Sequence, residues 1–508
     1  MNDLTAKTDK RIVIDANPYR TRAVLMENGR VVEICSEQRS RESLLGSIYR
    51  GRVCSMLPGM SAAFIDIGAE KNAFFSIADL DSPSPAASGA DIVEQADGEA
   101  NTRGGAVKKP RKALRVGQEL MVQVVKDAQG SKAARVSTRI SLSGHLLVLF
   151  PDSELIGISK HITEDADRER LRRLIAANKG EGVGAIVRTA AATRADEDIV
   201  AELERLKARW QSIQNAYRIS AAPKCLFSED GLVERTLRDL FRPDVSRITV
   251  NDRDCCSRIL ELVSELEPGA AEKVHFAENA PDLFEQLGIE KQIDEALARR
   301  VWLKSGAYIV LDQTEALLSI DVNSGKNIGR SDLRATALAT NCEAAGEIAR
   351  QLRLRNIGGI VIIDFIDLES AEDKQTVVRT LREALANDRT TALVHGMTTL
   401  GLVEVTRKKL RENLASSMQR ECLCCSGSGR VSTPETVALR IRARALARLF
   451  DLEAKRISIS AHPSVIALIK QHLPAERRLN AMEEVEVVLN ELRGAAMDEF
   501  EVRLLSDQ

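Results

Sequence analysis

Hydrophobic and polar residues alternate over much of the first 150 positions, in short runs that end at glycine or polar residues. The segment RIVIDANPYRTRAVLMENGRVVEI (11–34) alternates on both sides of Asn28-Gly29, a pair that favours the tight turn of a β-hairpin. Similar runs follow: GSIYRGRVCSML, SAAFIDIG, NAFFSIADL, ELMVQVVKD and ARVSTRISLSGHLLVLF. Short strands at this spacing are typical of a small barrel such as an OB fold.

Residues 82–111 interrupt this strand-like region. They are rich in Ser, Ala, Gly and Asp and contain almost no large apolar side chains. Such a segment cannot bury enough surface to offset the loss of chain entropy, so we predict a disordered insertion.

Helical patterns dominate residues 164–218, interrupted by the strand-like GVGAIVRTA, and residues 298–400 alternate between strands and helices. One helix is predicted to begin after Ser331, a suitable N-cap, and to stop before Gly358-Gly359. Thr433-Pro434-Glu435 combines a cap, a first-turn proline and an early acid, and predicts the start of another helix.

Composition narrows the class of protein. With 508 residues the chain is too long for one core, which suggests about three or four domains. Its net charge of −2 means that any nucleic-acid binding must depend on local basic patches. No run reaches the ~18 apolar residues of a membrane span, and the N-terminus has no apolar signal-peptide core. Nine scattered cysteines favour a reducing compartment, so a cytoplasmic protein is expected.

Two apolar segments each end in a carboxylate. LLSIDVNSG contains Asp321 and GIVIIDFIDL contains Asp364, and the strand exits of an α/β sheet are where ligands bind. Asn323 lies two residues after Asp321, so on a strand it faces the same side. Two acids there would suit Mg²⁺, which activates water for phosphodiester hydrolysis. The alternative is that both aspartates are turn or cap residues. The six histidines form no catalytic motif, and His395 is interpreted as structural.

Cys422 and Cys425 have the C-x-x-C spacing of half a zinc site. No second C-x-x-C and no nearby histidine completes four ligands within the chain. On this pattern alone, a redox pair or two buried thiols remain alternatives.

Longer motifs resemble the bacterial ribonuclease E/G family. LLSIDVNSGKN, TNCEAAGEIARQLRLRNIGGIVIIDFIDL, GLVEVTRKKLRENL and CLCCSGSG resemble its catalytic core, and AAFIDIGAEKNAFF and GAIVRTA resemble its OB-fold and 5′-sensor segments. The resemblance covers nearly the whole chain. Because a long Arg- and Pro-rich C-terminal extension is lacking, the chain is expected to be closest to the ribonuclease G type.

The resemblance implies an α+β multidomain fold. An RNase H-like subdomain would be split around inserted OB-fold and 5′-sensor modules. A DNase I-like catalytic subdomain, a zinc link and a small C-terminal α/β dimerisation domain would follow. The implied boundaries are 1–37 and 234–297 (RNase H-like), 38–143 (OB fold), 144–233 (5′-sensor), 298–418 (catalytic), 419–430 (zinc link) and 431–508 (small domain).

The implied activity is Mg²⁺-dependent endonucleolytic cleavage of single-stranded, A/U-rich RNA in rRNA processing and mRNA decay. The products would carry 5′-phosphate and 3′-hydroxyl ends, and a 5′-monophosphate on the substrate would stimulate cleavage. Two other functions stay open: an RNA-binding or assembly protein without nuclease activity, and a phosphodiesterase or DNase with the same metal site.

The resemblance also assigns roles to single residues. Asp321 and Asp364 match the Mg²⁺-binding aspartates, and Asn323 matches a supporting active-site Asn. Phe64 and Phe74 match aromatics that stack RNA bases, although each would otherwise be interpreted as barrel core. Lys126 and Lys132 match basic residues on the same RNA-binding surface.

In the sensor, Arg188 and Thr189 match the pair that grips a 5′-monophosphate, which a guanidinium and a hydroxyl suit. Alone, they would be interpreted as a surface feature. The pocket lining is matched by Gly144 and Val148. Two positions depart from the ribonuclease E pattern: Lys160 and Thr391 each stand where an Arg is expected, which weakens the expectation of 5′-end sensing.

The family's zinc link joins two chains. Two copies of Cys422 and Cys425 across a two-fold axis would give a Cys₄ tetrahedron and a homodimer, which can pair further into a dimer of dimers. Cys424 is left without a metal role. Leu423 replaces the family's usual Pro, a change that loosens the turn without removing a ligand.

Overall fold

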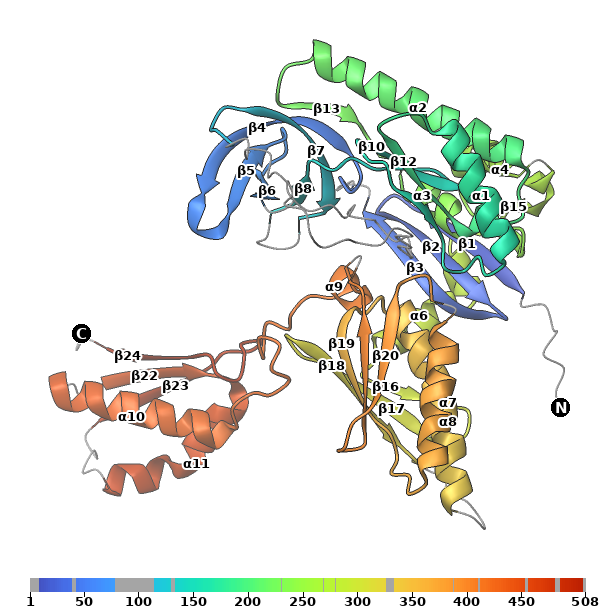
Figure 1. Ribbon diagram of the computed structural model, residues 1–508. Coiled ribbons are helices and arrows are strands. Elements are labelled where there is room, and N and C mark those ends of the chain that lie inside the picture. Colours follow the sequence, from blue (N-terminus) through green and yellow to red (C-terminus); the bar gives the residue numbers. More distant parts are fainter. Residues whose placement is uncertain are drawn as a thin grey trace, which may run out of the picture. The chain divides into compact units, whose positions relative to one another are not determined.

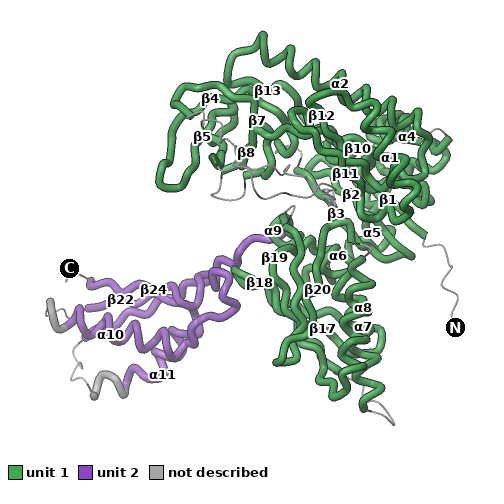
Figure 2. Tube along the Cα trace, in the orientation of Figure 1, with its two compact units in different colours: residues 1–417 green, residues 418–508 purple. Residues whose placement is uncertain are grey.

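A computed structural model of the chain contains two compact units, residues 1–417 and residues 418–508 (Figures 1 and 2). The structure describes residues 9–38, 43–77, 114–128, 133–229, 231–267, 269–278, 280–325, 333–386, 388–409, 412–452, 456–479 and 485–505. The predicted 82–111 insertion lies outside these residues. The fold is a mixture of helices and sheets that includes a small barrel, which confirms the predicted α+β class. No described helix is both long enough and apolar enough to cross a bilayer.

The first sheet of unit 1 joins distant parts of the chain. Its strand order is β15-β14-β1-β2-β3, and β1 runs parallel to β14. Helices α3 (Leu232–Leu240) and α4 (Arg253–Leu266) pack on it through a shared apolar core. The strands are β1 (Lys10–Ala16), β2 (Arg20–Glu27), β3 (Arg30–Gln38), β14 (Val245–Val250) and β15 (Val274–Phe276).

The turn at Asn28-Gly29 forms as predicted, with φ values of 51° and 77°. However, residues 11–34 form three strands, whereas the alternation alone predicted two. The reason is local: the side-chain oxygen of Asn17 accepts hydrogen bonds from the backbone N–H groups of Tyr19 and Arg20, each at 3.0 Å. This Asx turn, followed by Pro18, reverses the chain between β1 and β2.

The barrel has the strand order β13-β4-β5-β6-β8-β7, and β4 also pairs with β7 to close it. Alternate residues such as Ile65, Phe75 and Val136 are fully buried inside. The strands are β4 (Ile48–Leu57), β5 (Ala62–Asp66), β6 (Ala73–Ser76), β7 (Glu119–Lys126), β8 (Arg135–Ser137) and β13 (Lys224–Phe227).

A third sheet, ordered β11-β12-β10-β9, is covered by helices α1 (Asp165–Asn178) and α2 (Asp196–Ile219). This agrees with the prediction of helices interrupted by one strand. The strands are β9 (Leu142–Ser143), β10 (Leu147–Pro151), β11 (Ile156–Ile158) and β12 (Val183–Val187). A short 3₁₀ turn, Thr189–Ala191, follows β12.

The fourth sheet has the order β16-β17-β18-β19-β21-β20, with helices α7 (Leu333–Leu354) and α8 (Ala371–Leu385) against one face (Figure 1). The predicted N-cap of α7, Ser331, lies outside the described residues. Strands β16 and β21 were not predicted. The strands are β16 (Arg300–Trp302), β17 (Tyr308–Gln313), β18 (Leu317–Asn323), β19 (Gly359–Asp364), β20 (Ala392–Met397) and β21 (Leu402–Arg407). The remaining short helices are α5 (Leu283–Gln286), α6 (Ile289–Leu297) and α9 (Leu414–Met418). Helices α5 and α6 contact β1 and β3 of the first sheet.

The described residues of unit 2 form a three-stranded sheet, ordered β23-β22-β24, and two helices. Helix α10 begins at Pro434 as predicted, and the Thr433 hydroxyl accepts the N–H of Thr436 at 3.4 Å. Its elements are α10 (Pro434–Leu452), β22 (Arg456–Ala461), α11 (Pro463–Leu479), β23 (Glu486–Glu491) and β24 (Phe500–Leu504).

Within unit 1, a buried charge network ties the fourth sheet to the first. Arg353 of α7 lies 3.2 Å from Glu27 and 3.3 Å from Glu33, and Arg389 lies 2.6 Å from Glu33. Burial opposes ionisation of Glu33, but the charges of Arg389 and Arg353 outweigh it and lower the pKa from 4.5 to about 2. The network therefore stabilises unit 1 while Glu33 is ionised.

We predict that Glu33→Gln destabilises the protein by about 3 kcal/mol at pH 7, because it leaves two arginines facing an uncharged amide. A lowered carboxyl pKa adds stability that is complete above the unfolded pKa and is lost as pH falls toward the folded pKa. The difference from wild type should therefore shrink by about half between pH 7 and pH 3. Urea unfolding measures both values.

The exposed Glu261→Gln on α4 is the matched control, and it should change the unfolding free energy by less than about 0.5 kcal/mol. A Glu33→Gln deficit that is the same at pH 3 and pH 7 would contradict the proposed charge effect.

Candidate active site

Asp321 and Asp364 lie side by side on the face of the fourth sheet that α7 and α8 leave open. β18 and β19 are parallel neighbours, and their register places Asp321 directly opposite Asp364. Both side chains are exposed, whereas Ile320 and Ile363, one position earlier, are buried against the helices. Because adjacent strands are about 4.8 Å apart, the two carboxylates share one small patch of surface.

Asn323 belongs to the same patch. Its side-chain N–H group donates a 2.7 Å hydrogen bond to Oδ2 of Asp321. No described Lys, Arg or His forms an ion pair with Asp321 or Asp364. Two adjacent carboxylates without a positive partner repel each other, and a hard cation that accepts oxygen ligands would relieve this repulsion. The donor set therefore fits Mg²⁺.

A buried asparagine positions the loop that follows Asp364. Asn341 of α7 is completely buried, donates to the carbonyl of Ile366 at 2.8 Å, and accepts the N–H of Ile366 at 3.0 Å. This paired contact holds the backbone two residues after the second acid. This role was not predicted, although a lone Asn on the apolar face of a helix is a signal for such a contact.

His395, which was interpreted as structural, lies within β20. Its Nε2 is 3.0 Å from the Thr406 hydroxyl, and Thr406 is paired with Ile360 at the opposite end of β19 from Asp364. Its hydrogen-bond partner Thr406 is thus level with Ile360, four positions before Asp364 on β19, so this contact does not involve the acids.

The barrel presents a row of aromatic and basic side chains on its outer side. Phe64 pairs with Phe74, Phe74 with Arg135, and Arg135 with Lys126, so one side chain from each of four strands lies in line. The two rings meet edge to face with centroids 6.1 Å apart. Both are partly exposed, so neither belongs to the barrel core. Arg135 was not predicted, and Lys132 lies outside the described residues.

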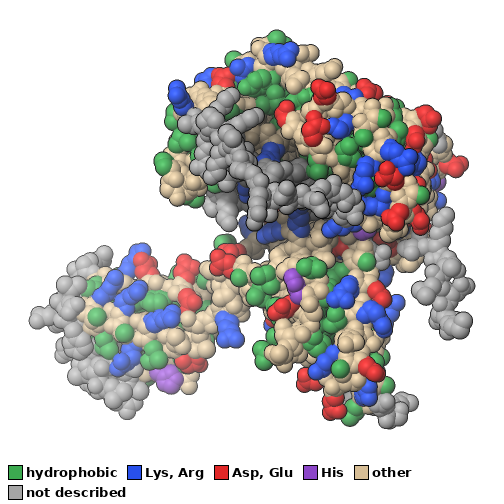
Figure 3. Space-filling model, in the orientation of Figure 1, with side chains coloured by type: hydrophobic (Ala, Val, Ile, Leu, Met, Phe, Trp, Pro, Cys, Tyr) green, Lys and Arg blue, Asp and Glu red, His purple; other side chains and the backbone are tan. Residues whose placement is uncertain are grey.

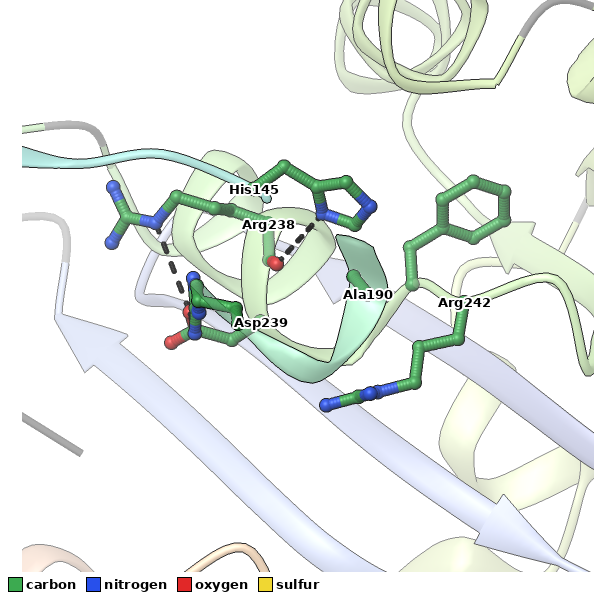
Figure 4. Close-up of a pocket in the computed structure, with 7 residues that line it drawn as sticks. His145, Ala190, Arg238, Asp239 and Arg242 are labelled. Carbon is green, nitrogen blue, oxygen red and sulfur yellow. Dashed lines mark hydrogen bonds and ion pairs between the residues drawn. The ribbon is translucent and has the colours of Figure 1, made fainter. Parts of the chain in front are cut away.

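A shallow pocket lies between the third sheet and α3 (Figure 4). Figure 4 shows His145, Ala190, Arg238, Asp239 and Arg242 around it, and the His145 ring is hydrogen-bonded to the carbonyl of Arg238 at 3.1 Å. Arg188 and Phe241 complete the lining. Three guanidinium groups within one pocket make it a candidate site for an anion.

Of the four predicted sensor residues, only Arg188 is among the residues that line this pocket. Arg188 lines it, donating to the carbonyl of Gly144 at 2.8 Å and pairing with Asp239 at 2.8 Å. Thr189 follows directly, with its hydroxyl 2.8 Å from that of Ser159. Val148 is buried in a small apolar cluster with Phe150 and Ile186, and it is not among the pocket-lining residues.

Positive charge exceeds negative charge in the pocket lining, which contains three arginines and one aspartate. Burial lowers the pKa of Arg242, and the neighbouring charges of Arg389 and Arg188 lower it further. Burial, together with nearby arginines, also lowers the pKa of His145 to about 4, so this ring is neutral at pH 7. Bound negative charge would relieve the repulsion among the guanidinium groups.

Lys160 and Thr391, the two departures from the family pattern, are both exposed. Arg389 stands two residues before Thr391 and donates to the carbonyl of Asp239 at 2.9 Å. Sequence reasoning missed Arg238, Arg242 and Arg389, because single arginines carry no spacing signal.

The cysteine motif lies in unit 2, where Cys422 and Cys424 are exposed and Cys425 is partly exposed. Hydrogen bonds from the backbone of Cys424 and of Cys425 lower the pKa of the Cys422 thiol, which favours the thiolate form that binds zinc. No group of three or more His, Cys, Asp or Glu side chains in the described parts of the chain is arranged to hold a metal. Two cysteines of one chain thus offer at most half of a four-ligand site.

Comparison with known proteins places these features in a family. Residues 141–410 match the model of the Ribonuclease E/G family. The chain is 35% identical to ribonuclease G of Escherichia coli (strain K12) over 497 residues, which cover 97% of this chain and 99% of that protein. It is also 35% identical to ribonuclease G of Haemophilus influenzae over 490 residues, 96% of this chain and 97% of that protein.

Ribonuclease E of a Nostoc species is 35% identical over 418 residues, but the match covers 80% of this chain and only 58% of that protein. The chain therefore belongs to the ribonuclease E/G family and is close to ribonuclease G.

Proposed function

We propose that the protein is a Mg²⁺-dependent endoribonuclease that cuts single-stranded, A/U-rich RNA in rRNA processing and mRNA decay. Family membership supports endoribonuclease activity in RNA processing. The metal dependence, the products and the preferred RNA are the further proposal. The observation that carries it is the register that sets Asp321 directly opposite Asp364 on an open sheet face.

The carboxylates of Asp321 and Asp364 would hold the ion. When bound, Mg²⁺ would supply Lewis-acid chemistry and neutralise charge on the phosphate. The amide of Asn323 holds Oδ2 of Asp321 and so fixes the orientation of that carboxylate. For 5′-phosphate and 3′-hydroxyl products, a water oxygen must bond to phosphorus while the bond from phosphorus to the 3′ oxygen breaks. The attacking water gives up a proton in this step, and the leaving 3′ oxygen takes one up.

The outer row of the barrel is suited to hold the RNA. Phe64 and Phe74 offer rings on which bases of any sequence can stack, each worth roughly 1–3 kcal/mol. Lys126 and Arg135 continue the row with groups that bind phosphates without reading sequence. Positive and negative side chains are interspersed over the visible surface of the molecule (Figure 3), so binding of RNA relies on such local groups.

The alternative is an RNA-binding or assembly protein of the same fold without nuclease activity. A protein that only binds RNA has no use for two adjacent, unpaired carboxylates, because they repel phosphate. A DNase or other phosphodiesterase could use the same acids. The family match favours RNA over DNA.

We predict that Asp321→Asn and Asp364→Asn each reduce cleavage at least about 100-fold while RNA binding is retained, because each removes one ligand charge from the ion. The measurement is a gel assay on a single-stranded RNA with Mg²⁺, paired with fluorescence anisotropy for binding. Added chelator should abolish cleavage by the wild type.

The matched control is Asp312→Asn, a partly exposed aspartate of β17 on the same sheet face. It pairs with Arg299 and lies two positions along β17 from Val310, the residue opposite Asp321. It should cut at the wild-type rate. If the Asp321→Asn or the Asp364→Asn enzyme cuts RNA as fast as the control, the proposed active site is wrong.

We further propose that the pocket around Arg188 binds a 5′-monophosphate and thereby stimulates cleavage. A terminal phosphate would accept hydrogen bonds from the guanidinium groups of Arg188 and Arg242 and relieve their mutual repulsion. An arginine was expected at position 160 and at position 391, where this chain has Lys160 and Thr391. The arginines that line the pocket supply positive charge for the phosphate in their place.

The wild type should therefore cut 5′-monophosphorylated RNA faster than the same RNA with a 5′-hydroxyl. Arg188→Gln should bring this ratio close to one by slowing only the phosphorylated substrate. Arg218→Gln, an exposed arginine in the last turn of α2, is the control and should keep the wild-type ratio. Equal rates on both RNAs with the wild-type enzyme would show that this pocket does not sense the 5′ end.

We also propose that Zn²⁺ joins two chains through Cys422 and Cys425 of each. Two observations support this proposal. The pKa of Cys422 is lowered, and among the described residues a single chain offers only two of the four ligands. A tetrahedral Cys₄ site needs both pairs, so metal binding and dimer formation would occur together.

Native mass spectrometry should find one zinc per two chains, and Cys422→Ser should yield zinc-free monomers. Cys54→Ser, which removes an exposed cysteine of the barrel, should leave the dimer intact. A zinc-loaded monomer would contradict the shared site.

A further inference from the structure

Arg300, Trp302 and Tyr308 form an exposed cluster at the edge of the fourth sheet. Trp302 is 57% exposed, although tryptophan is among the most buried side chains on average. The rings of Trp302 and Tyr308 meet with centroids 5.1 Å apart. The guanidinium of Arg300 lies 4.5 Å from the centre of the Tyr308 ring and 5.8 Å from that of Trp302.

The cluster lies on the same sheet face as the two acids. Val301 and Ile309, which alternate with its residues, are buried in the core beneath α7 and α8. Strand register sets the spacing: Trp302 is paired with Tyr308, and Tyr308 with Asn323. Trp302 is therefore two strands from the Asn that contacts Asp321, or roughly 10 Å. At ~3.4 Å per stacked nucleotide, this distance is a few nucleotides along a single strand.

The hairpin that carries Trp302 is held firmly. The carboxylate of Glu343 on α7 accepts the N–H groups of Lys304 and Ser305, at 2.8 and 3.3 Å. The N–H of Leu303 donates to the carbonyl of Ala307 at 2.8 Å, and both residues are buried. The exposure of Trp302 is thus a feature of an ordered strand.

The chemistry of the cluster matches a nucleotide better than a protein surface. Trp302 and Tyr308 offer ring surface, and Arg300 offers positive charge on a face whose other charged groups include Asp321 and Asp364. No described Asp or Glu side chain forms an ion pair with Arg300. Exposed aromatics on a sheet face are a common platform for the bases of single-stranded RNA.

We propose that Arg300, Trp302 and Tyr308 form a base-binding subsite in which a nucleobase near the scissile phosphate stacks on Trp302 while Arg300 pairs with a neighbouring phosphate. The proposal rests on the proposed endoribonuclease function and deepens it. The subsite would fix the position of the strand relative to the acids, so Trp302 is a positioning residue.

Fluorescence tests the contact directly. The chain has only two tryptophans, so Trp210→Phe leaves Trp302 as the sole tryptophan. In a Trp210→Phe, Asp321→Asn protein, which would bind RNA without cutting it, a short single-stranded RNA should quench the remaining tryptophan emission in a saturable way. RNA binding by anisotropy without such quenching would overturn the subsite, whatever the cleavage assay shows.

Kinetics test the function of the contact in the otherwise wild-type chain. Trp302→Leu keeps an apolar side chain but removes the ring face, and should lower kcat/KM for single-stranded RNA roughly ten- to hundredfold. Trp302→Phe should restore most of the loss. Tyr19→Leu, an 87% exposed aromatic in the β1–β2 turn, is the control and should cut like the wild type.

An abasic scan locates the contacted base. One abasic position near the cut should slow the wild type, and the same change should have no further effect on Trp302→Leu.

Equal kcat/KM for Trp302→Leu and the wild type would overturn the proposal while leaving the nuclease function intact. If RNA quenches Trp302 emission but the wild-type protein does not cut RNA, the proposed nuclease function is contradicted and the base-binding subsite is supported. Tryptophan emission that changes with protein concentration but not with RNA would make this face an interface between copies of the chain, and would also overturn it.

Discussion

The parallel register between β18 and β19 is the constraint on which the candidate active site depends. Side chains of a strand alternate between the two faces of a sheet, so a shift of one residue would turn Asp321 or Asp364 toward the helices. The register is held by the residues in between. Ile320 and Ile363 are buried beneath α7 and α8, and burying a carboxylate in their place would cost several kcal/mol. The apolar side of the sheet thus determines where the acids stand on its polar side.

The proposed RNA contacts use few aromatic residues, each supported by a strand. Aromatic residues make up only 3% of the chain, yet Phe64, Phe74, Trp302 and Tyr308 all have exposed ring surface. In each case the adjacent strand residue is buried, so the backbone is fixed while the ring stays accessible. Positively charged side chains lie next to these rings: Arg135 and Lys126 beside the two phenylalanines, and Arg300 beside Trp302 and Tyr308. This combination of stacking and unspecific charge suits a nuclease with loose sequence preference.

Alternation of apolar and polar residues predicted most of the strands, and the Asn28-Gly29 turn and the start of α10 were predicted from local chemistry. Strands β11, β13 to β16 and β21 to β24 were not predicted. LVEVTR alternates clearly, but β16 is three residues long and offers too little pattern to detect. The break between β1 and β2 depends on hydrogen bonds made by Asn17, which a hydrophobicity pattern does not register.

The sequence by itself determined which residues have the chemistry for a site: the two aspartates, the neighbouring asparagine, the cysteine pair and the family motifs. Each is encoded by residue type and short spacing. Only the tertiary structure decided which of them meet. It set Asp321 against Asp364 across 43 positions of sequence, aligned Phe64 and Phe74 with Arg135 and Lys126, gathered arginines around the Arg188 pocket, and left Trp302 open beside the acids. The physical reason is that strand pairing and helix packing bring together residues that are far apart in the chain, and no local pattern records those distances.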